Sequence, residues 1–217
     1  MWLALDTATS HASVAVGNAA ADAAEESLDG ARQHARAIIP MIGAALAVRG
    51  TTLDGVTGVV LADGPGSFTG LRVAASVAKG LVSTRGLPLR TAPSLMVRAA
   101  AIAADGEAVL VSSDALRGDR YAAAYRFAGS RVETLLSPAV IPGATLGALA
   151  ASLGARVAEA GPPSAAWLLE LLGREGGTVA VSNAESWEPV YGRPAEAQAK
   201  WEREHGHRLP DPAGAGG

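Results

Sequence analysis

Three polar side chains near the start of the sequence have the types and the spacing of a phosphate-binding loop. Asp6 follows the apolar run 1–5, which is predicted to be a buried strand, and Thr7 and Thr9 lie in the turn after it. In such a loop the carboxylate holds a metal-bound water, while the hydroxyl groups contact phosphate. The same residues also suit an ordinary turn, in which short polar side chains bond to their own backbone. The residue types alone favour the turn.

A second candidate for chemistry is a glycine-rich turn, whose residues are Gly64, Pro65, Gly66, Ser67 and Gly70. Glycine reaches positive φ without steric strain, and a helix that starts after such a turn can hold an anion at its N-terminus. The turn is not a Walker A loop, because no Gly-Lys-Ser/Thr follows it. Its third glycine also comes one residue too late for a dinucleotide fingerprint. Anion binding is therefore a weak interpretation of this turn.

The helix predicted after this turn has more apolar surface than one sheet needs. A strand over 55–61 precedes the turn, Ser67 is a good N-cap, and Gly86 is expected to end a helix that starts at about Phe68. Such a helix is either buried on two sides within its own domain, or packs on its sheet and also on a partner protein. Its polar residues form one narrow stripe, made of Arg72, Ser76, Lys79 and Ser83.

The helix predicted over 31–49 has the same excess of apolar surface. It begins with polar residues and becomes apolar on several faces from Ile38 onward. Pro40 lies inside it, removes one internal hydrogen bond and is expected to kink the helix. His34 has no second histidine near it in the sequence, which favours a packing or capping role over metal binding. This helix is therefore a second candidate for contact with a partner.

The rest of the chain alternates short strands and helices, which predicts an α/β fold. A turn at 104–106 is a candidate domain boundary. The charged turn 114–120 is interpreted as a solvated loop, with an active-site loop as the alternative. Further strands are expected at 11–16, 20–28, 86–91, 108–112, 121–127, 131–136, 155–160 and 178–181, and further helices at 93–103, 144–152 and 165–172.

Composition argues against several classes of function. The net charge of the 217 residues is −3 and no run of Lys or Arg occurs, so the sequence has no electrostatic footprint for nucleic acid. The absence of cysteine excludes disulfides, thiolate metal sites and cysteine nucleophiles. No signal peptide is expected, and the longest apolar stretch, 35–48, is too short to span a membrane.

As one string, residues 64–72 (GPGSFTGLR) are specific, and they resemble the signature of the TsaB (YeaZ) family. These proteins are partner subunits of the bacterial complex that forms N6-threonylcarbamoyladenosine next to the anticodon of certain tRNAs. The family commonly has Asp-Ala-Arg in the charged turn, whereas here Leu116 precedes Arg117. Other segments similar to the family are 3–9, His34 with 38–42, 79–81, 94–95, 114–115, 121–125 and 189–193.

The resemblance implies an α/β protein with the actin-like (RNase H-like) ATPase fold. It would have two lobes, each with a mixed central sheet and flanking helices. The N-terminal lobe is expected at 1–104 and carries the partner-binding helices, and a smaller C-terminal lobe is expected at 105–193. The tail 194–217 is not covered by the resemblance and is expected to be partly disordered. A cytoplasmic location is also implied.

The resemblance further implies a role in assembly. Such subunits pair with a TsaD-type catalytic subunit through the first two helices, a TsaE-type ATPase subunit joins the complex, and the subunit alone often forms a homodimer through the same surface. Contact with tRNA would be indirect, and no membrane contact is expected. The partner-binding residues expected on the two helices are His34, Ile38, Met41, Ile42, Phe68, Leu71, Arg72, Ala75 and Ala78.

We therefore expect a subunit without catalytic residues, cofactor or metal. The catalytic paralogue carries a His-x-x-x-His metal pair, and the aligned positions here are about Ser94 and Arg98, neither of which supplies a neutral nitrogen ligand. Asp6, Thr7 and Thr9 would then form a degenerate phosphate loop. Two alternatives stay open. One is an active actin-like ATPase or kinase that uses Asp6 and Thr7, and the other is a glycoprotease-like metallopeptidase, which the missing histidine pair opposes.

Overall fold

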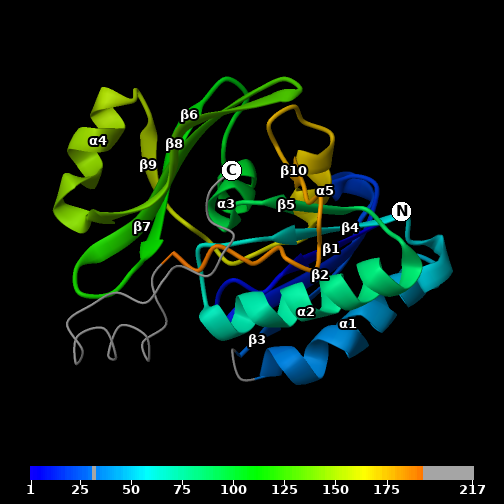
Figure 1. Cartoon of the computed structure of the whole chain (residues 1–217). Helices are drawn as coiled ribbons and strands as arrows, with labels where there is room; N and C mark the ends of the chain where they lie inside the picture. Colours follow the sequence, from blue (N-terminus) through cyan, green and yellow to red (C-terminus); the bar gives the residue numbers. More distant parts are fainter. Residues whose placement is uncertain (31–32, 193–217) are drawn as a thin grey trace, which may run out of the picture.

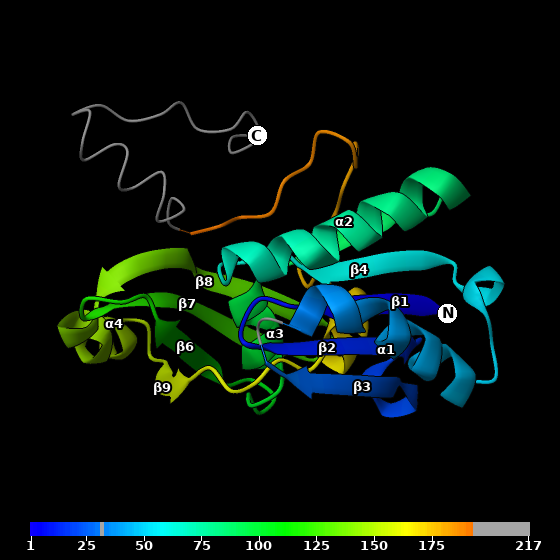
Figure 2. The ribbon, with the colours of Figure 1, turned by 90° about the horizontal axis from the view of Figure 1, so that it is seen from below.

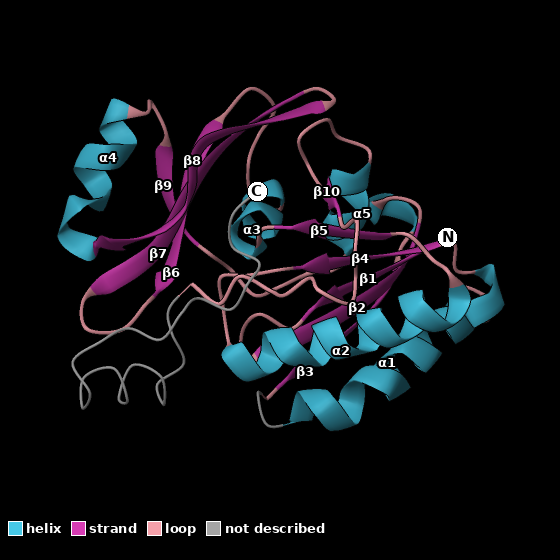
Figure 3. Cartoon of the chain, in the orientation of Figure 1, coloured by secondary structure: helices cyan, strands magenta, loops and turns pink. Residues whose placement is uncertain are grey.

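A computed structural model describes residues 1–30 and 33–192 of the chain, which form two sheets with helices packed around them (Figure 1). The first sheet has six strands in the order β10-β5-β4-β1-β2-β3, and the second has four in the order β8-β7-β6-β9. Figure 3 shows α1 and α2 on one face of the first sheet, α3 between the two sheets, and α4 at the far side of the second sheet. Within the described ranges, no helix is long and apolar enough to cross a membrane.

The first sheet is built around two strands whose residues are nearly all buried. β1 pairs in parallel with β4, β4 pairs in parallel with β5, and β1-β2-β3 form an antiparallel meander. Strands that are covered on both faces need apolar residues at successive positions, which explains the unbroken apolar runs of β1 and β4. The strands are β1 (Trp2–Asp6), β2 (His11–Gly17), β3 (Ala24–Asp29), β4 (Gly58–Ala62), β5 (Leu89–Ala92) and β10 (Val179–Ala180).

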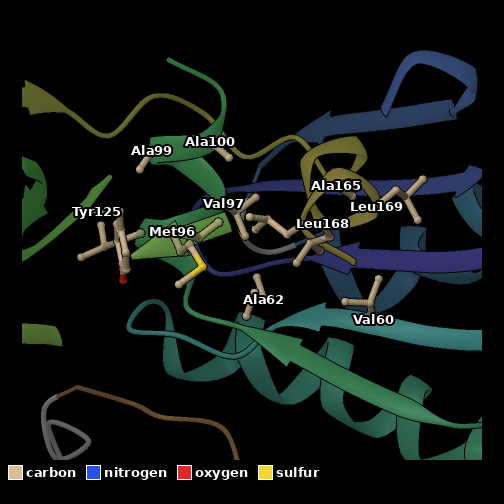
Figure 4. Packing of buried hydrophobic residues seen from close by; sticks show 14 of the residues in the cluster. Val60, Ala62, Met96, Val97, Ala99, Ala100, Tyr125, Ala165, Leu168 and Leu169 are labelled. Carbon is tan, nitrogen blue, oxygen red and sulfur yellow. The ribbon is translucent and has the colours of Figure 1, made fainter. Parts of the chain in front are cut away.

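Alternating side chains of these strands contribute to two separate cores. Leu3 and Leu5 face α1 (His34–Val48) and α2 (Phe68–Arg85), while Ala4 faces the opposite core. That second core contains α3 (Ser94–Ala100) and α5 (Ala166–Leu172) together with side chains of the second sheet. Figure 4 shows labelled residues of β4, α3, α5 and the second sheet in this one cluster.

The second sheet forms a smaller lobe around a long antiparallel hairpin. β6 pairs antiparallel with β7, β7 pairs antiparallel with β8, and β9 adds to β6 in parallel. The elements of this lobe are β6 (Ala108–Asp114), β7 (Asp119–Ala128), β8 (Arg131–Pro142), β9 (Arg156–Glu159) and α4 (Leu146–Ser152). Short 3₁₀ helices lie at η1 (Ala20–Asp22), η3 (Leu53–Gly55) and η4 (Gly143–Thr145).

The structure differs from the predicted division of the chain after residue 160. The predicted C-terminal lobe ran to residue 193, but α5 packs on the first sheet and β10 pairs with β5 at its edge. Residues 183–192 then cross α2. The chain therefore leaves the first lobe at about residue 105 and returns to it. Arg193 and the predicted tail 194–217 lie outside the described residues.

The ends of α2 agree with the sequence prediction. The Ser67 hydroxyl accepts a hydrogen bond from the Gly70 backbone N–H at 3.2 Å, as an N-cap does. At the other end Gly86 has φ 64°, the left-handed conformation that glycine adopts without strain. These two signals fix where α2 begins and ends.

Candidate partner-binding surface and interlobe cavity

An apolar groove of about 510 Å³ lies between α1 and α2, on the side that faces away from the sheet. Figure 2 shows the two helices running along the same face of the molecule. The large hydrophobic residue most open to solvent in the groove is Ile39, whose side chain is 61% exposed. The residues that line the groove are Ala35, Ile38, Ile39, Phe68, Thr69, Arg72, Val73, Ser76 and Val77.

Most of the residues predicted to bind a partner lie in the core of this chain instead. His34, Ile38, Met41, Ile42, Leu71, Ala75 and Ala78 are all buried, with at most 8% of any of them exposed. The reason is helical periodicity: the most apolar positions of each helix cover the sheet and pack between the helices. Phe68 and Arg72 do reach the surface, and Ile38 lines the groove from below.

The groove residues missing from the prediction are Ala35, Ile39, Thr69, Val73, Ser76 and Val77. The sequence contained a signal for some of them, because Ala35 and Ile39 are four residues apart, as are Thr69 and Val73, so each pair shares a helix face. His34 is explained by packing and hydrogen bonding, since its Nε2 lies 3.0 Å from the carbonyl oxygen of Ser10.

The side chains of the predicted phosphate loop bond to groups of the protein itself. Asp6 is fully buried and its Oδ1 accepts a hydrogen bond from the Ala8 N–H at 3.0 Å. Thr7 Oγ1 donates to the Gly70 carbonyl at 2.6 Å, and Thr9 Oγ1 accepts from the His11 N–H at 3.1 Å. This is the arrangement of the turn interpretation, in which polar side chains satisfy the backbone.

Arg98 lies beside Asp6 and supplies a positive charge to it. Its Nη1 is 3.4 Å from Asp6 Oδ2 and donates to the Ser94 carbonyl at 2.5 Å. Both partners of the ion pair are buried, with Arg98 4% exposed. A buried carboxylate needs a counter-charge, and here the protein supplies it from α3. Arg98 stands at one of the two positions that align with the histidine pair of the catalytic paralogue.

The glycines of the motif turn allow it to pack against the turn between β1 and β2. A methyl group at Gly66 would overlap the Ala8 carbonyl, and one at Gly70 would overlap the Thr7 carbonyl. Gly64 has φ 115° and lies against the carbonyl of Val190. Close approach of backbone to backbone therefore explains all three glycines of the motif turn.

A cavity of about 490 Å³ lies between the motif turn and the second lobe. Pro65, Gly66, Ser67 and Thr9 line it, whereas Asp6 and Thr7 are not among its lining residues. The remaining lining residues are Ala8, Ser10, Phe68, Leu95, Arg98, Ser113, Asp114, Ala115, Leu116, Tyr121, Ala160 and Tyr191.

The charged turn 114–120 borders this cavity. The Leu116 N–H donates to Asp114 Oδ1 at 3.0 Å, and both Leu116 and Arg117 have φ near +60°. Leu116 is 59% exposed although it is apolar. Asp114, Ala115 and Leu116 thus line the same cavity as residues of the motif turn.

Asp63, directly before the motif turn, is a half-buried residue whose carboxyl group has a shifted pKa. Burial raises the pKa of Asp63 from 3.8 to about 6, against the opposing effect of a hydrogen bond with the Thr91 side chain. Burial, with the nearby Asp63 charge, also raises the pKa of Tyr125 on β7. The two groups come from different lobes and meet at the junction between them.

A sequence profile of the family described as "TsaD: tRNA N6-adenosine threonylcarbamoyltransferase" matches residues 28–166. The chain is 34% identical over 147 residues to the tRNA threonylcarbamoyladenosine biosynthesis protein TsaB of Escherichia coli (strain K12), over 64% of this chain and 63% of that protein. The chain belongs to the TsaD-type family and, within it, to the TsaB (YeaZ) family. The predicted family membership is therefore confirmed.

A second relative is the protein of the same description from Haemophilus influenzae (strain ATCC 51907 / DSM 11121 / KW20 / Rd). It is 37% identical over 121 residues, which are 55% of this chain and 51% of that protein. The matched part thus spans between about half and 63% of the length of these two curated relatives.

Two solved structures from Pseudomonas aeruginosa are similar over most of the chain. One is titled "Crystal structure of an uncharacterized protein with similarity to peptidase YEAZ", with a TM-score of 0.73 and 25% identity over 88% of this chain and 99% of that chain. The other, "YeaZ from Pseudomonas aeruginosa", has a TM-score of 0.70 and 25% identity over 88% of this chain and 98% of that chain. The predicted actin-like (RNase H-like) fold, with two mixed sheets and flanking helices, is confirmed.

Proposed function

We propose that this chain is a non-catalytic partner subunit in the biosynthesis of N6-threonylcarbamoyladenosine in tRNA, and that it binds a TsaD-type catalytic subunit. The observation that carries the proposal is the apolar groove of α1 and α2, which the chain's own elements leave uncovered within the described residues. An exposed apolar surface of this kind is typical of a protein–protein contact. The family names of the relatives support the choice of pathway and partner.

The Asp6–Arg98 pair supports the non-catalytic part of the proposal. An actin-like ATPase or kinase would need the Asp6 carboxylate for a metal-bound water, but in this chain that carboxylate faces a guanidinium at 3.4 Å. Displacing Arg98 would leave two buried charges without a partner, which is strongly unfavourable. For the metallopeptidase alternative, the described residues contain no group of three His, Asp or Glu side chains that could hold a metal ion.

The proposal includes finer points that follow from the family resemblance. A TsaE-type ATPase subunit would join the complex, and the chain alone would form a homodimer through the same groove. Contact with tRNA would be indirect, in keeping with the net charge of −3, and the complex would act in the cytoplasm.

The test is co-purification with the TsaD-type subunit of the same organism, read by light scattering, with two groove variants. Ile39→Glu and Val77→Glu each place a carboxylate in the groove, where burial without a partner is unfavourable. We expect a one-to-one complex for the wild type and an affinity loss of about 100-fold or more for each variant. Leu71 and Ile42, which were also predicted to bind the partner, are unsuitable for this test, because both are buried and a carboxylate there would destabilise the fold.

Val157→Glu is the matched control. Val157 lies on β9 of the second lobe and is 45% exposed, so the same substitution there should leave the complex intact. If both groove variants bind as tightly as the wild type, the assigned surface is wrong. Tight ATP binding by this chain alone, lost in Asp6→Ala, would support the ATPase alternative and contradict the non-catalytic role.

A further inference from the structure

The segment 183–192, which we call the strap, returns from the far edge of the first sheet and lies along α2. Figure 2 shows α2 between α1 and the strap, which is drawn in orange. Lys79 Nζ is 3.0 Å from Glu188 Oε1, and the Val190 N–H donates to the Asp63 carbonyl at 2.7 Å. These contacts hold the strap to α2 at Lys79 and to the residue before the motif turn at Asp63, and no strap residue lines the groove.

At the N-terminal end of α2 the strap holds one arginine in place. The Arg72 guanidinium lies 4.3 Å above the centre of the Phe68 ring and 5.7 Å from that of Tyr191. Arg72 Nε donates to Tyr191 Oη at 3.2 Å, and Tyr191 Oη donates to Glu188 Oε2 at 3.2 Å. The rings of Phe68 and Tyr191 are 4.6 Å apart. The guanidinium is thus stacked and hydrogen-bonded, which restricts its rotamers.

Arg72 nevertheless keeps most of its binding capacity. It is exposed and lines the groove together with Phe68. The Glu188 carboxylate acts on Arg72 electrostatically, but among residues 1–30 and 33–192 no carboxylate lies within ion-pair distance of it, and its two Nη groups make no hydrogen bond. A guanidinium with both Nη groups unused has the planar pair of donors that matches a carboxylate.

We propose that the strap positions Arg72 to recognise a carboxylate beside the apolar helical surface that docks in the groove. The proposal rests on the proposed function, since that surface would belong to the TsaD-type subunit. The groove is lined on one side by alanine and isoleucine of α1 and on the other by valines of α2, so it fits an apolar helix face. Arg72 lies at the edge of the groove, where its positive charge favours an apolar helix face that carries a carboxylate beside it.

The physical advantage of the strap is pre-organisation. A free arginine side chain loses rotamer entropy when it is immobilised at an interface, and this opposes binding. Tyr191 removes part of that loss before the partner arrives, because it already holds the guanidinium by a hydrogen bond and by its ring. Tyr191 is therefore a positioning residue that acts through Arg72.

The test measures the affinity of the full chain for the TsaD-type subunit at about 50 and about 300 mM salt, since screening weakens charge pairs. The variants are Arg72→Ala, Tyr191→Ala and the double variant, with Tyr191→Phe to remove the hydroxyl alone. We expect Arg72→Ala to weaken binding by roughly 10- to 100-fold and to reduce its salt dependence. Tyr191→Ala should weaken binding by roughly 10-fold, and the double variant should bind no more weakly than Arg72→Ala.

Val190→Ala is the control within the strap. Val190 is the neighbour of Tyr191 and is 56% exposed. The Val190→Ala variant should therefore bind the partner with the same affinity as the wild type. If Val190→Ala loses as much affinity as Tyr191→Ala, or if the effects of Arg72→Ala and Tyr191→Ala add, the strap acts by direct contact and the positioning role is overturned. If the wild type binds and Arg72→Ala binds equally well, this inference alone fails. If the wild type does not bind, the proposed function fails with it.

Discussion

Asp6 stands at a position that is associated with catalysis in the actin-like fold, but in this chain it is buried and paired with an arginine. Its position at the end of β1 is the one in which the resemblance to actin-like ATPases implies a metal-bound water. Here Arg98, 3.4 Å away and buried beside it, supplies the counter-charge instead. Each of these buried charges is partnered by the other, so the pair acts as a structural unit of the fold.

At the residue scale, Asp63 gives a prediction about pH. Its pKa is about 6 in the folded chain and 3.8 in the unfolded one, so the folded state binds more protons between these values. The raised pKa of Asp63 adds to the free energy of unfolding below about pH 4. This contribution, about 3 kcal/mol, is lost as the pH rises through 6. We expect Asp63→Asn, which has no charge to bury, to become more stable relative to the wild type by about this amount between pH 4 and pH 7.

The measurement is urea unfolding of both proteins at pH 4, 5, 6 and 7, compared as a difference at each pH. The comparison cancels the titration of other groups, which the two proteins share. A difference that stays constant across this range would show that Asp63 titrates with an ordinary pKa and that its carboxylate is not desolvated.

At the scale of the element, α2 contains two glycines for which opposite effects are expected. Glycine inside a helix is less stable than alanine by about 1 kcal/mol, so Gly80→Ala, with open space around its Cβ position, should stabilise the chain by about that amount. Gly70→Ala should instead destabilise it by about 2 kcal/mol, because the added methyl group overlaps the Thr7 carbonyl and forces the two turns apart. Thermal or urea unfolding of the two variants decides the matter, and stabilisation by Gly70→Ala would contradict the close packing of the motif turn on β1.

The elements could be predicted from the sequence where the signals are local. Ser67 and Gly86 mark the ends of α2, because capping and left-handed glycine depend on a few neighbouring residues. The surface that each helix presents could not be predicted in the same way. Leu71 and Ile42 were expected at the partner surface, but which apolar face covers the sheet depends on the crossing of α1 and α2, a property of tertiary packing.

The candidate site was predicted only in part for the same reason. Phe68 and Arg72 were recognised from the motif, and they do line the groove. The contact of Tyr191 with Arg72 joins positions 119 residues apart in sequence, and no local pattern indicates it. The ion pair between Asp6 and Arg98 was likewise not predicted, although the sequence analysis aligned both residues with functional positions of related proteins.

At the scale of the whole molecule, the chain leaves the first lobe and later returns to it. α5 is held at its start by β2 and β3, since the Ala165 N–H donates to Ser13 Oγ at 2.8 Å and the Ser164 hydroxyl donates to Glu25 Oε2 at 3.0 Å. The return also gives α2 its second neighbour, the strap. The surface that we propose for the partner, on α1 and α2, is therefore flanked by a strap that comes from the other end of the described chain, after the second lobe.

This topology predicts that the two lobes unfold together. One hydrophobic cluster contains Val60 of β4, Leu168 of α5 and Tyr125 of β7, so its loss exposes buried surface in both lobes at once (Figure 4). We expect amides of β1 and β4 and amides of β6 and β7 to reach the same highest free energy of exchange, measured by hydrogen exchange in increasing urea. Tyr125→Ala should lower both values together, by about 3–5 kcal/mol. If β6 and β7 open at a free energy about 2 kcal/mol or more below that of β1, the second lobe is a separate cooperative unit and the shared cluster does not couple the two.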